Sequence, residues 1–327
     1  MPVASLRRGL QRLTLSAHAR GTKAVYDTAM GSYARFCNYV RKGGASLPRA
    51  EKFLLFIVFL AQVCKLAFGT IKVYAAGVRS RMLRSGMSDP AYRHGRPCYQ
   101  LKLLMRGIQR NSAARAQRVR KPLTKYKLLR VLQAIPSMAI PQLDQLRFRA
   151  AVLLAFWGFF RSASFCSNSG SRSILRRCDI SFKSPPAGKD YVVAHLRKSK
   201  TKQFEHTRVY IYANSMTALC PFNALQEYFV ATRGIRLLNQ GNSLFFLPGK
   251  ALTLPVFNCL LKTSVRLGGL NPALYSSHSL RAGAATTAAN SGVPPYLIKK
   301  LGRWKSETYN TYIRHPKHGI RKAQGML

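Results

Sequence analysis

Apolar side chains recur every three or four positions through most of the first 110 residues, which is the spacing of helices with one buried face. We predict one helix over residues 22–40 and a second that Pro48 opens and that continues through the apolar stretch 53–64. A third helix is capped by Thr70 and stops at Gly86. Its apolar stripe consists of Ile71, Tyr74, Val78 and Met82.

A fourth, short helix is predicted over residues 99–110. Lys102, Arg106 and Arg110 follow one another at four-residue steps, so the three cations lie along one face of this helix. Such a stripe is either the solvated surface of an ordinary helix or a surface that binds DNA phosphates. The high positive charge of the whole chain favours DNA phosphates.

The second part of the chain combines helices with one pair of strands. Helices are predicted over residues 124–134 and 142–161, and the β-rich runs 191–196 and 207–212 flank a polar stretch, which is typical of a β-hairpin. Helical patterns then return over residues 221–231, 254–267, 279–290, 295–301 and near 307–313. The fold class is therefore predicted to be mainly α with a small antiparallel β-sheet.

A basic segment separates these two parts. Residues 111–122 read NSAARAQRVRKP, with no large aliphatic side chain except Val119, which is the composition of a linker. We therefore predict an N-terminal helical domain over residues 1–110, a linker over 111–123 and a second domain over 124–327. A basic linker suits a chain that wraps around a duplex, so its cations are candidate DNA contacts: Arg118, Arg120 and Lys121.

The charge of the chain points to a polyanionic partner. Lys and Arg number 54 against 9 Asp and Glu, which gives a formal net charge of +45. Basic residues are interleaved with apolar periodicity, as in a folded DNA-binding protein. A ribosomal or histone-like protein and a binder of membrane surfaces are the alternatives that charge alone allows.

The few acidic residues argue against a metal-dependent nuclease, because two-metal sites need clustered carboxylates and these nine are scattered. The seven cysteines show neither a CxxC pair nor zinc-ligand spacing. The apolar run 53–64 is too short for a membrane span. We therefore expect no metal, no cofactor, no small-molecule substrate and no membrane partner.

The strongest chemical motif lies near the C-terminus. His278 and Arg281 stand three residues apart, so one helix turn would direct both side chains the same way. A guanidinium binds the non-bridging oxygens of a phosphodiester and an imidazole moves a proton, so the pair suits phosphate chemistry. By itself an HxxR pair is usually accidental. Taken alone, Arg161 is more simply the cap of a helix C-terminus, and the turn around Lys200 a solvated basic loop.

The stretch HSLRAGAATTAANSGVPPYLIKKLGRWKSETYNTYIR resembles the C-terminal signature of the tyrosine recombinases, the phage-integrase superfamily. Within that superfamily, GRW…YIR is most similar to the eukaryotic mobile-element branch of the Cryptons and DIRS-type elements. GTKAVYDTAMGSYARFC and GTIKVYAAGVRS resemble the N-terminal DNA-clamping domain of this branch. The resemblance covers nearly the whole chain, and it implies an N-terminal core-binding domain of SAM-like fold followed by a tyrosine recombinase catalytic domain.

The resemblance also assigns roles. It makes Tyr312 the nucleophile, with Tyr309, one helical turn away, as the rival. The family's His or Trp position falls on Trp304 or Arg303, and we favour Trp304 because an indole N–H can donate to phosphate. Ser164 departs from the family, which often carries an acid there. The remaining catalytic residues implied are the two arginines, the hairpin lysine and the histidine: Arg161, Arg281, Lys200 and His278.

What the resemblance implies about function is site-specific DNA cleavage and rejoining through a 3′-phosphotyrosine, without metal or cofactor. The implied partner is double-stranded DNA, bound by four protomers on two duplexes, in the nucleus of a eukaryote that carries the mobile element. Three other interpretations stay open. They are a domesticated, catalytically silent DNA-binding protein on the same fold, a type IB topoisomerase, and a basic structural protein of ribosome or chromatin.

Overall fold

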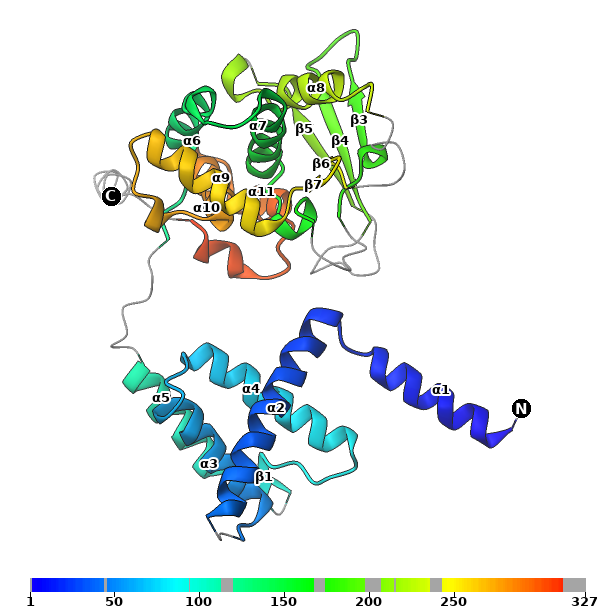
Figure 1. The fold of residues 1–327 in the computed structure, drawn as a ribbon, viewed down its shortest axis with the longest axis vertical. Coiled ribbons are helices and arrows are strands. Elements are labelled where there is room, and N and C mark those ends of the chain that lie inside the picture. The colour runs from blue at the N-terminus through cyan, green and yellow to red at the C-terminus, as the bar shows by residue number, and fades with distance from the viewer. Residues whose placement is uncertain are drawn as a thin grey trace. The chain divides into compact units, whose positions relative to one another are not determined.

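The computed structural model describes residues 2–43, 46–93, 95–112, 120–167, 174–197, 207–214, 216–235 and 243–313. The chain divides into two compact units, Met1–Gln117 and Arg118–Leu327, and each is described by itself (Figure 1). The predicted linker 111–123 stays a prediction, because residues 113–119 lie outside the described part of the chain.

The N-terminal unit is helical. Its elements are α1 (Val3–Ser16), α2 (Arg20–Lys42), α3 (Arg49–Gln62), α4 (Phe68–Arg84), the two-residue strands β1 (Tyr92–Arg93) and β2 (Arg96–Pro97), and α5 (Tyr99–Ser112). Helices α2, α3, α4 and α5 pack around one aromatic core that includes Phe36, Phe53 and Phe56. Gly77 lets α2 and α4 approach closely, since a Cβ there would lie 2.9 Å from the ring of Tyr26.

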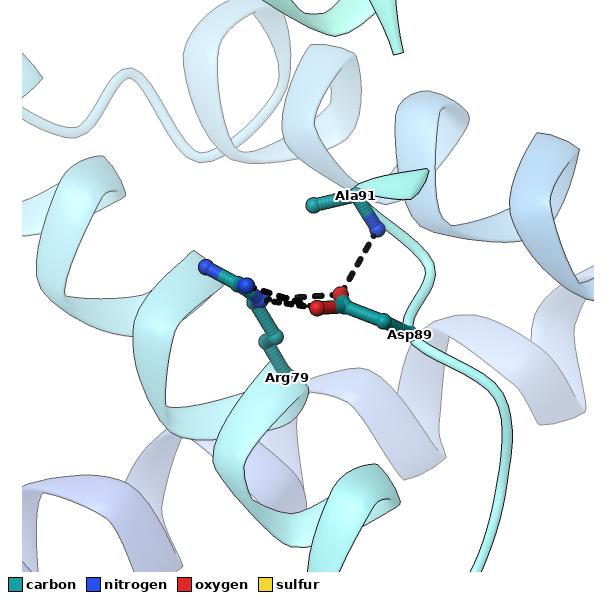
Figure 2. A network of polar contacts seen from close by, with 3 residues as sticks. All are labelled: Arg79, Asp89 and Ala91. Atoms are coloured by element: carbon teal, nitrogen blue, oxygen red, sulfur yellow. Dashed lines mark hydrogen bonds and ion pairs between the residues drawn. The ribbon is translucent and has the colours of Figure 1, made fainter. Parts of the chain in front are cut away.

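The predicted stripe of the third helix is confirmed, with Ile71, Val78 and Met82 buried in this core and Tyr74 packed against it. The predicted cap is wrong, because α4 begins one turn earlier and has Ala67 at its N-cap rather than Thr70. The chain after α4 is fixed by a fork of hydrogen bonds from Arg79 to the carboxylate of Asp89, which also accepts from the backbone N–H of Ala91 at 3.0 Å (Figure 2).

The pattern did not predict α1. Four of its apolar residues, Val3, Leu6, Leu10 and Leu13, fall on one face, and all four side chains are exposed. The periodicity is therefore that of an amphipathic helix, but the described chain does not bury its apolar face.

The C-terminal unit contains most of the described helices and one three-stranded sheet. Before the sheet come α6 (Lys125–Gln133), η1 (Ile135–Ser137), α7 (Gln142–Trp157), η2 (Ser162–Ser164) and η3 (Arg177–Asp179). The sheet consists of β3 (Ile180–Lys183), β4 (Tyr191–Leu196) and β5 (Thr207–Tyr212). After it come η4 (Thr217–Leu219), α8 (Pro221–Ala231), β6 (Phe246–Leu247), β7 (Lys250–Ala251), α9 (Leu254–Leu267), η6 (Pro272–Leu274), α10 (Ser277–Asn290), α11 (Pro295–Gly302) and η7 (Glu307–Thr311).

Helix α7 is the centre of this unit. All seven residues from Ala150 to Phe156 are buried, and α8 and α10 pack against the helix. A helix that is apolar on all sides has no solvent-facing stripe, which is why its hydrophobic pattern did not show where it ends. The structure ends α7 at Trp157, four residues before the predicted limit of 161.

The sheet is antiparallel, in the order β3-β4-β5. The predicted hairpin of residues 191–196 and 207–212 is confirmed as β4 and β5, which pair from Tyr191 with Tyr212 to Leu196 with Thr207. Strand β3 was not predicted, because four residues are too few for period-two alternation to stand out. The predicted fold class, mainly α with a small antiparallel sheet, is confirmed.

Candidate active site

A sharp turn after α7 forms the base of the site. Gly158 ends the helix, and Phe159 takes a left-handed conformation with φ of 50°, rare for a residue with a side chain. A Cβ on Gly158 would lie 2.2 Å from the ring of Phe160, so only glycine fits there. Arg161 then follows in extended backbone, with φ of −80° and ψ of 145°. Arg161 therefore does not end the helix as predicted, and its half-buried side chain belongs to the turn that follows it.

Arg281 lies beneath this turn and is almost completely buried, with 2% of its surface exposed. Its guanidinium donates to the carbonyl of Phe159 and, at 2.6 Å, to the carbonyl of Gly302. The guanidinium also lies over two aromatic rings, 4.3 Å from the ring centre of Trp304 and 5.7 Å from that of Tyr312. Its Nε has no hydrogen-bond partner among the described residues.

A third guanidinium comes from Arg303, directly after α11. Arg303 is in the left-handed region, with φ of 57°. This conformation turns its side chain back, and its guanidinium donates to the carbonyls of Gly158 at 2.9 Å and Phe159 at 3.0 Å. The Phe159 carbonyl thus accepts from both Arg281 and Arg303. These two arginines, which are distant from the turn in the sequence, fix the position of the turn.

The arginines concentrate positive charge. Burial, followed by the positive charges of Arg161 and Arg303, lowers the pKa of Arg281 to about 9. Burial and the charge of Arg161 lower the pKa of Arg303 to about 10. Among the described residues, no ion pair involves Arg161 or Arg281. Because close cations disfavour one another's charged form, a bound anion would stabilise this cluster.

Trp304 fills the space between Arg281 and the C-terminal tyrosines. Its ring centre lies 5.3 Å from that of Tyr312 and 6.3 Å from that of Tyr309. A Cβ on Gly302 would lie 1.6 Å from this indole, so the glycine makes room for it. The indole Nε1 is buried and has no hydrogen-bond partner in the described part of the chain. Its predicted donation to phosphate stays a prediction, and the contacts observed for Trp304 are packing contacts.

His278 and Arg281 occupy one turn of α10 but face different surroundings. His278 is exposed and Arg281 is buried. Three residues advance an α-helix by about 300°, which leaves the two side chains roughly 60° apart rather than in line. The expectation that both point the same way is therefore wrong for this helix. Arg281 faces the turn after α7, and His278 faces solvent at the edge of a pocket.

That pocket has a volume of about 140 Å³ and joins the motif residues to the segment before α6. Tyr312, at the end of η7, lines it and is half-buried. Tyr309 instead is 6% exposed and packs against Trp304. The full lining is Arg120, Lys121, Pro122, His278, Ser279, Ala282, Thr311 and Tyr312.

The segment 120–123 is fixed against η6 and α10 by backbone hydrogen bonds. Lys121 donates its N–H to Leu274 at 2.8 Å, and Leu123 donates to Ser279 at 2.9 Å. Arg120 reaches the hydroxyl of Ser276 at 3.2 Å. A Cβ on Gly283 would lie 1.9 Å from the carbonyl oxygen of Leu123, so α10 needs a glycine at this contact. Sequence reasoning missed that these residues form a wall of the site. The run of small residues after Arg281 was the available signal.

Other predicted site residues lie elsewhere. Lys200 and Arg118 fall outside the described residues. Lys102, Arg106 and Arg110 are exposed on α5 of the N-terminal unit, while Leu104 and Ile108 of the same helix pack against its core. The described residues contain no group of three or more His, Cys, Asp or Glu side chains that could hold a metal ion. Within the same residues, no helix has the length and apolar character that a membrane span requires.

No family model and no curated protein matches the sequence. Solved structures match the fold. The XerH site-specific recombinase bound to palindromic difH substrate, in a post-cleavage complex, has a TM-score of 0.64 and 14% identity, covering 93% of this chain and 79% of that one. The Tn1549 transposon integrase in complex with transposon right end DNA has a TM-score of 0.55 and 13% identity, covering 94% of this chain and 99% of the integrase chain. A lambda integrase dimer (residues 75–356) bound to a COC′ core site has a TM-score of 0.53 and 15% identity, covering 96% of this chain and 95% of the integrase chain. The fold is therefore that of the tyrosine recombinase catalytic domains.

Proposed function

We propose that this chain is a tyrosine recombinase that cleaves and rejoins DNA strands with Tyr312 as its nucleophile. The observation that carries the proposal is the buried guanidinium of Arg281 beneath the ring of Tyr312, with Arg161 and Arg303 close enough to lower its pKa. A cluster of positive charge beside a pocket-lining phenol suits attack on a phosphodiester. The three solved structures compared above are bound to a DNA substrate, a core site or transposon-end DNA, which supports DNA as the substrate.

The reaction balances without an external energy source. The phenolic oxygen of Tyr312 attacks phosphorus in line, a tyrosyl O–P bond forms, and the bond from phosphorus to the 5′-oxygen breaks. The product is a 3′-phosphotyrosine and a free 5′-hydroxyl. His278, exposed on the same pocket, accepts the phenolic proton, and Lys200 gives a proton to the leaving 5′-oxygen. A 5′-hydroxyl of a partner strand reverses the steps and completes the exchange.

Arg161 and Arg281 stabilise the charge that develops on the non-bridging oxygens. This role requires a movement, because the rings of Trp304 and Tyr312 cover Arg281 in the structure. Tyr312 follows the five-residue η7, a short element that can shift without unfolding a long helix. When the Tyr312 ring leaves Arg281, the guanidinium opens to phosphate and the phenol enters the pocket. Trp304 keeps the hydrophobic support beneath both.

The DNA contacts are proposed at two places. In the C-terminal unit, Arg120 and Lys121 line the pocket beside His278, where they would bind phosphates next to the scissile one, with Arg118 just upstream. In the N-terminal unit, the exposed stripe of Lys102, Arg106 and Arg110 would bind the backbone. Following the sequence resemblance, we assign the chain to the Crypton and DIRS-type branch, acting in the nucleus as four protomers on two duplexes.

A second candidate is a catalytically silent DNA-binding protein on the same fold. The observation that favours it is the covered state of Arg281, whose guanidinium donates to the backbone carbonyls of Phe159 and Gly302. A site that never opens would bind DNA through its exposed cations and leave the strand intact.

The test is covalent trapping. Full-length protein is incubated in excess EDTA with a nicked duplex from its own genomic flanks, so that the short fragment diffuses away after cleavage. We expect a DNA adduct that survives denaturation, with the phosphate mapped by mass spectrometry to Tyr312. An adduct that forms only with added magnesium would overturn the metal-free mechanism. DNA binding without any adduct on any flank would establish the silent protein instead.

A further inference from the structure

The outer face of the β3-β4-β5 sheet is built unlike its inner face. Side chains alternate between the two faces along each strand. The inner residues, such as Val192, Ala194 and Ile211, are buried, and Phe182 packs edge-on against Phe222 of α8. The sheet and α8 can be seen together in Figure 1. The outer residues are Ser181, Lys183, Tyr191, Val193, His195, Arg208, Tyr210 and Tyr212, here called the tyrosine face.

Three tyrosine rings gather on this face. Tyr191 lies opposite Tyr212 in the register, with ring centres 5.3 Å apart, and its ring centre is 6.1 Å from that of Tyr210. Tyr210 is 50% exposed and Tyr212 is 57% exposed. Together with their neighbours they border a hollow of about 350 Å³, lined by seven of the eight face residues, all except Tyr212. Flat rings in such a hollow offer stacking surfaces to another flat ring.

The charge of the face is positive. Lys183 and Arg208 are exposed, His195 lies opposite Arg208 in the register, Lys183 lies opposite Tyr191 near the other end of the sheet, and none of the eight residues is acidic. None of them lines the pocket of Tyr312. The cleavage mechanism therefore gives this surface no role, and its aromatic and basic residues call for a separate ligand.

We propose that the tyrosine face binds single-stranded nucleic acid, with bases stacking on Tyr210 and Tyr212 and phosphates held by Lys183 and Arg208. Exposed aromatic rings set among cations are how proteins bind single strands, because every unpaired base offers a flat π-face and every nucleotide a phosphate. Duplex DNA does not fit as well, since its base faces are already stacked on one another. The proposal stands independently of the cleavage function.

The test uses full-length protein and photo-crosslinking, because a chain of net charge +45 also binds DNA at other places. An oligothymidylate that carries one 5-iododeoxyuridine is bound at high salt, where screening suppresses purely electrostatic binding. It is then irradiated, and the crosslinked peptide is identified by mass spectrometry. We expect crosslinks to Tyr210 or Tyr212, and none at these residues when the same oligonucleotide is annealed into a duplex.

Variants complete the test. Tyr210→Ala combined with Tyr212→Ala should weaken single-strand binding about 10- to 100-fold at high salt, while the corresponding Phe variants bind like the parent. Tyr126→Ala, a similarly exposed tyrosine on α6, is the matched control and should bind normally. Adduct formation at Tyr312 should stay unchanged in all of them. Crosslinks confined to other segments, equal crosslinking by duplex, or an equal loss in the Tyr126 control would overturn the proposal.

Discussion

Two regions of the candidate active site differ in how they are held. The buried floor consists of Arg281, Arg303 and Trp304 around the turn after α7, and each arginine there donates to backbone carbonyls. The open rim consists of Arg120, Lys121, His278 and Tyr312, which line the pocket. Helix α10 contributes to both, since it places Arg281 in the floor and His278 on the rim.

The difference separates two kinds of residue. An arginine of the floor supports the fold and the chemistry at once, because its guanidinium donates to backbone carbonyls that would otherwise lack a partner. A rim residue presents its functional group from a backbone that other residues fix. Substitutions on the rim should therefore affect mainly DNA binding or cleavage, whereas substitutions in the floor should also lower stability substantially.

The largest effect is expected on the rim, at the nucleophile. Tyr312→Phe removes only the attacking oxygen and keeps the ring above Arg281, so covalent adduct should vanish while unfolding and DNA affinity stay near those of the parent. The matched control is Tyr309→Phe, whose ring packs in the interior and which should still form adduct. Loss of adduct in the Tyr309 variant but not in the Tyr312 variant would move the nucleophile to Tyr309.

The next test compares both regions on one helix. His278→Ala should slow cleavage by ~10²–10⁴-fold, the usual contribution of a general acid–base group. It should lower the free energy of unfolding less than Arg281→Ala does, because His278 is exposed and Arg281 is buried. Arg281→Ala should slow cleavage by ~10²–10³-fold. It should also lower stability, since the Gly302 carbonyl loses its guanidinium donor.

Single-turnover cleavage rates and urea unfolding measure the two effects separately. An Arg281 variant as stable as the parent would show that the floor is not held by its guanidinium. A His278 variant that loses as much stability as the Arg281 variant would place that side chain among the structural residues as well.

The identities of the main site residues were easier to predict from the sequence than the contacts that hold them. His278, Arg281 and Tyr312 stand in one motif-bearing stretch, and the structure does bring His278 and Tyr312 to one pocket and places Arg281 beneath the Tyr312 ring. Most helix limits also followed from periodicity, with α8 and α9 matching the prediction residue for residue. Helix limits are local features, so spacing and capping rules predict them, whereas the roles of His278, Arg281 and Tyr312 were implied by the family resemblance.

The floor depends on contacts between distant segments. The sequence offered no sign that Phe159 would take a left-handed conformation or that Arg303 would donate to its carbonyl, 144 residues away. Periodicity likewise could not show that residues 120–123 dock on α10, because those bonds join two separate stretches of backbone. The docking of residues 120–123 depends on the close approach of Leu123 to Gly283, and only the three-dimensional structure shows this contact.

That glycine gives the third prediction. Gly283→Ala places a Cβ against the Leu123 carbonyl, and because backbone lies on the other side the contact can relax only by displacing residues 120–123. We expect a loss of ~1–3 kcal/mol in the free energy of unfolding, typical of overpacking, together with weaker DNA binding as Arg120 and Lys121 move. Gly107→Ala on α5, which meets nothing within 4 Å, should instead be neutral or stabilising. Equal stability of the two variants, measured in urea, would contradict the docking of this segment.

The smallest expected effect isolates the charges of the rim from its backbone. The hydrogen bond that holds Lys121 in place comes from its backbone N–H, so Lys121→Gln should keep the pocket wall and remove one phosphate contact. The slope of log affinity against log salt should then fall by about 1, with the cleavage rate at saturating DNA unchanged. Arg120→Gln should lower the slope in the same way. It should also lower the free energy of unfolding slightly, because the Arg120 guanidinium donates to the hydroxyl of Ser276. Arg233→Gln, an exposed cation after α8 that does not line the pocket, serves as the control and should leave the slope as it is.

A slope that stays constant in the Lys121 and Arg120 variants would mean that these cations do not contact phosphate. A reduced cleavage rate at saturating DNA would instead show that they act on the transition state, which would make the rim part of the chemistry rather than of binding alone.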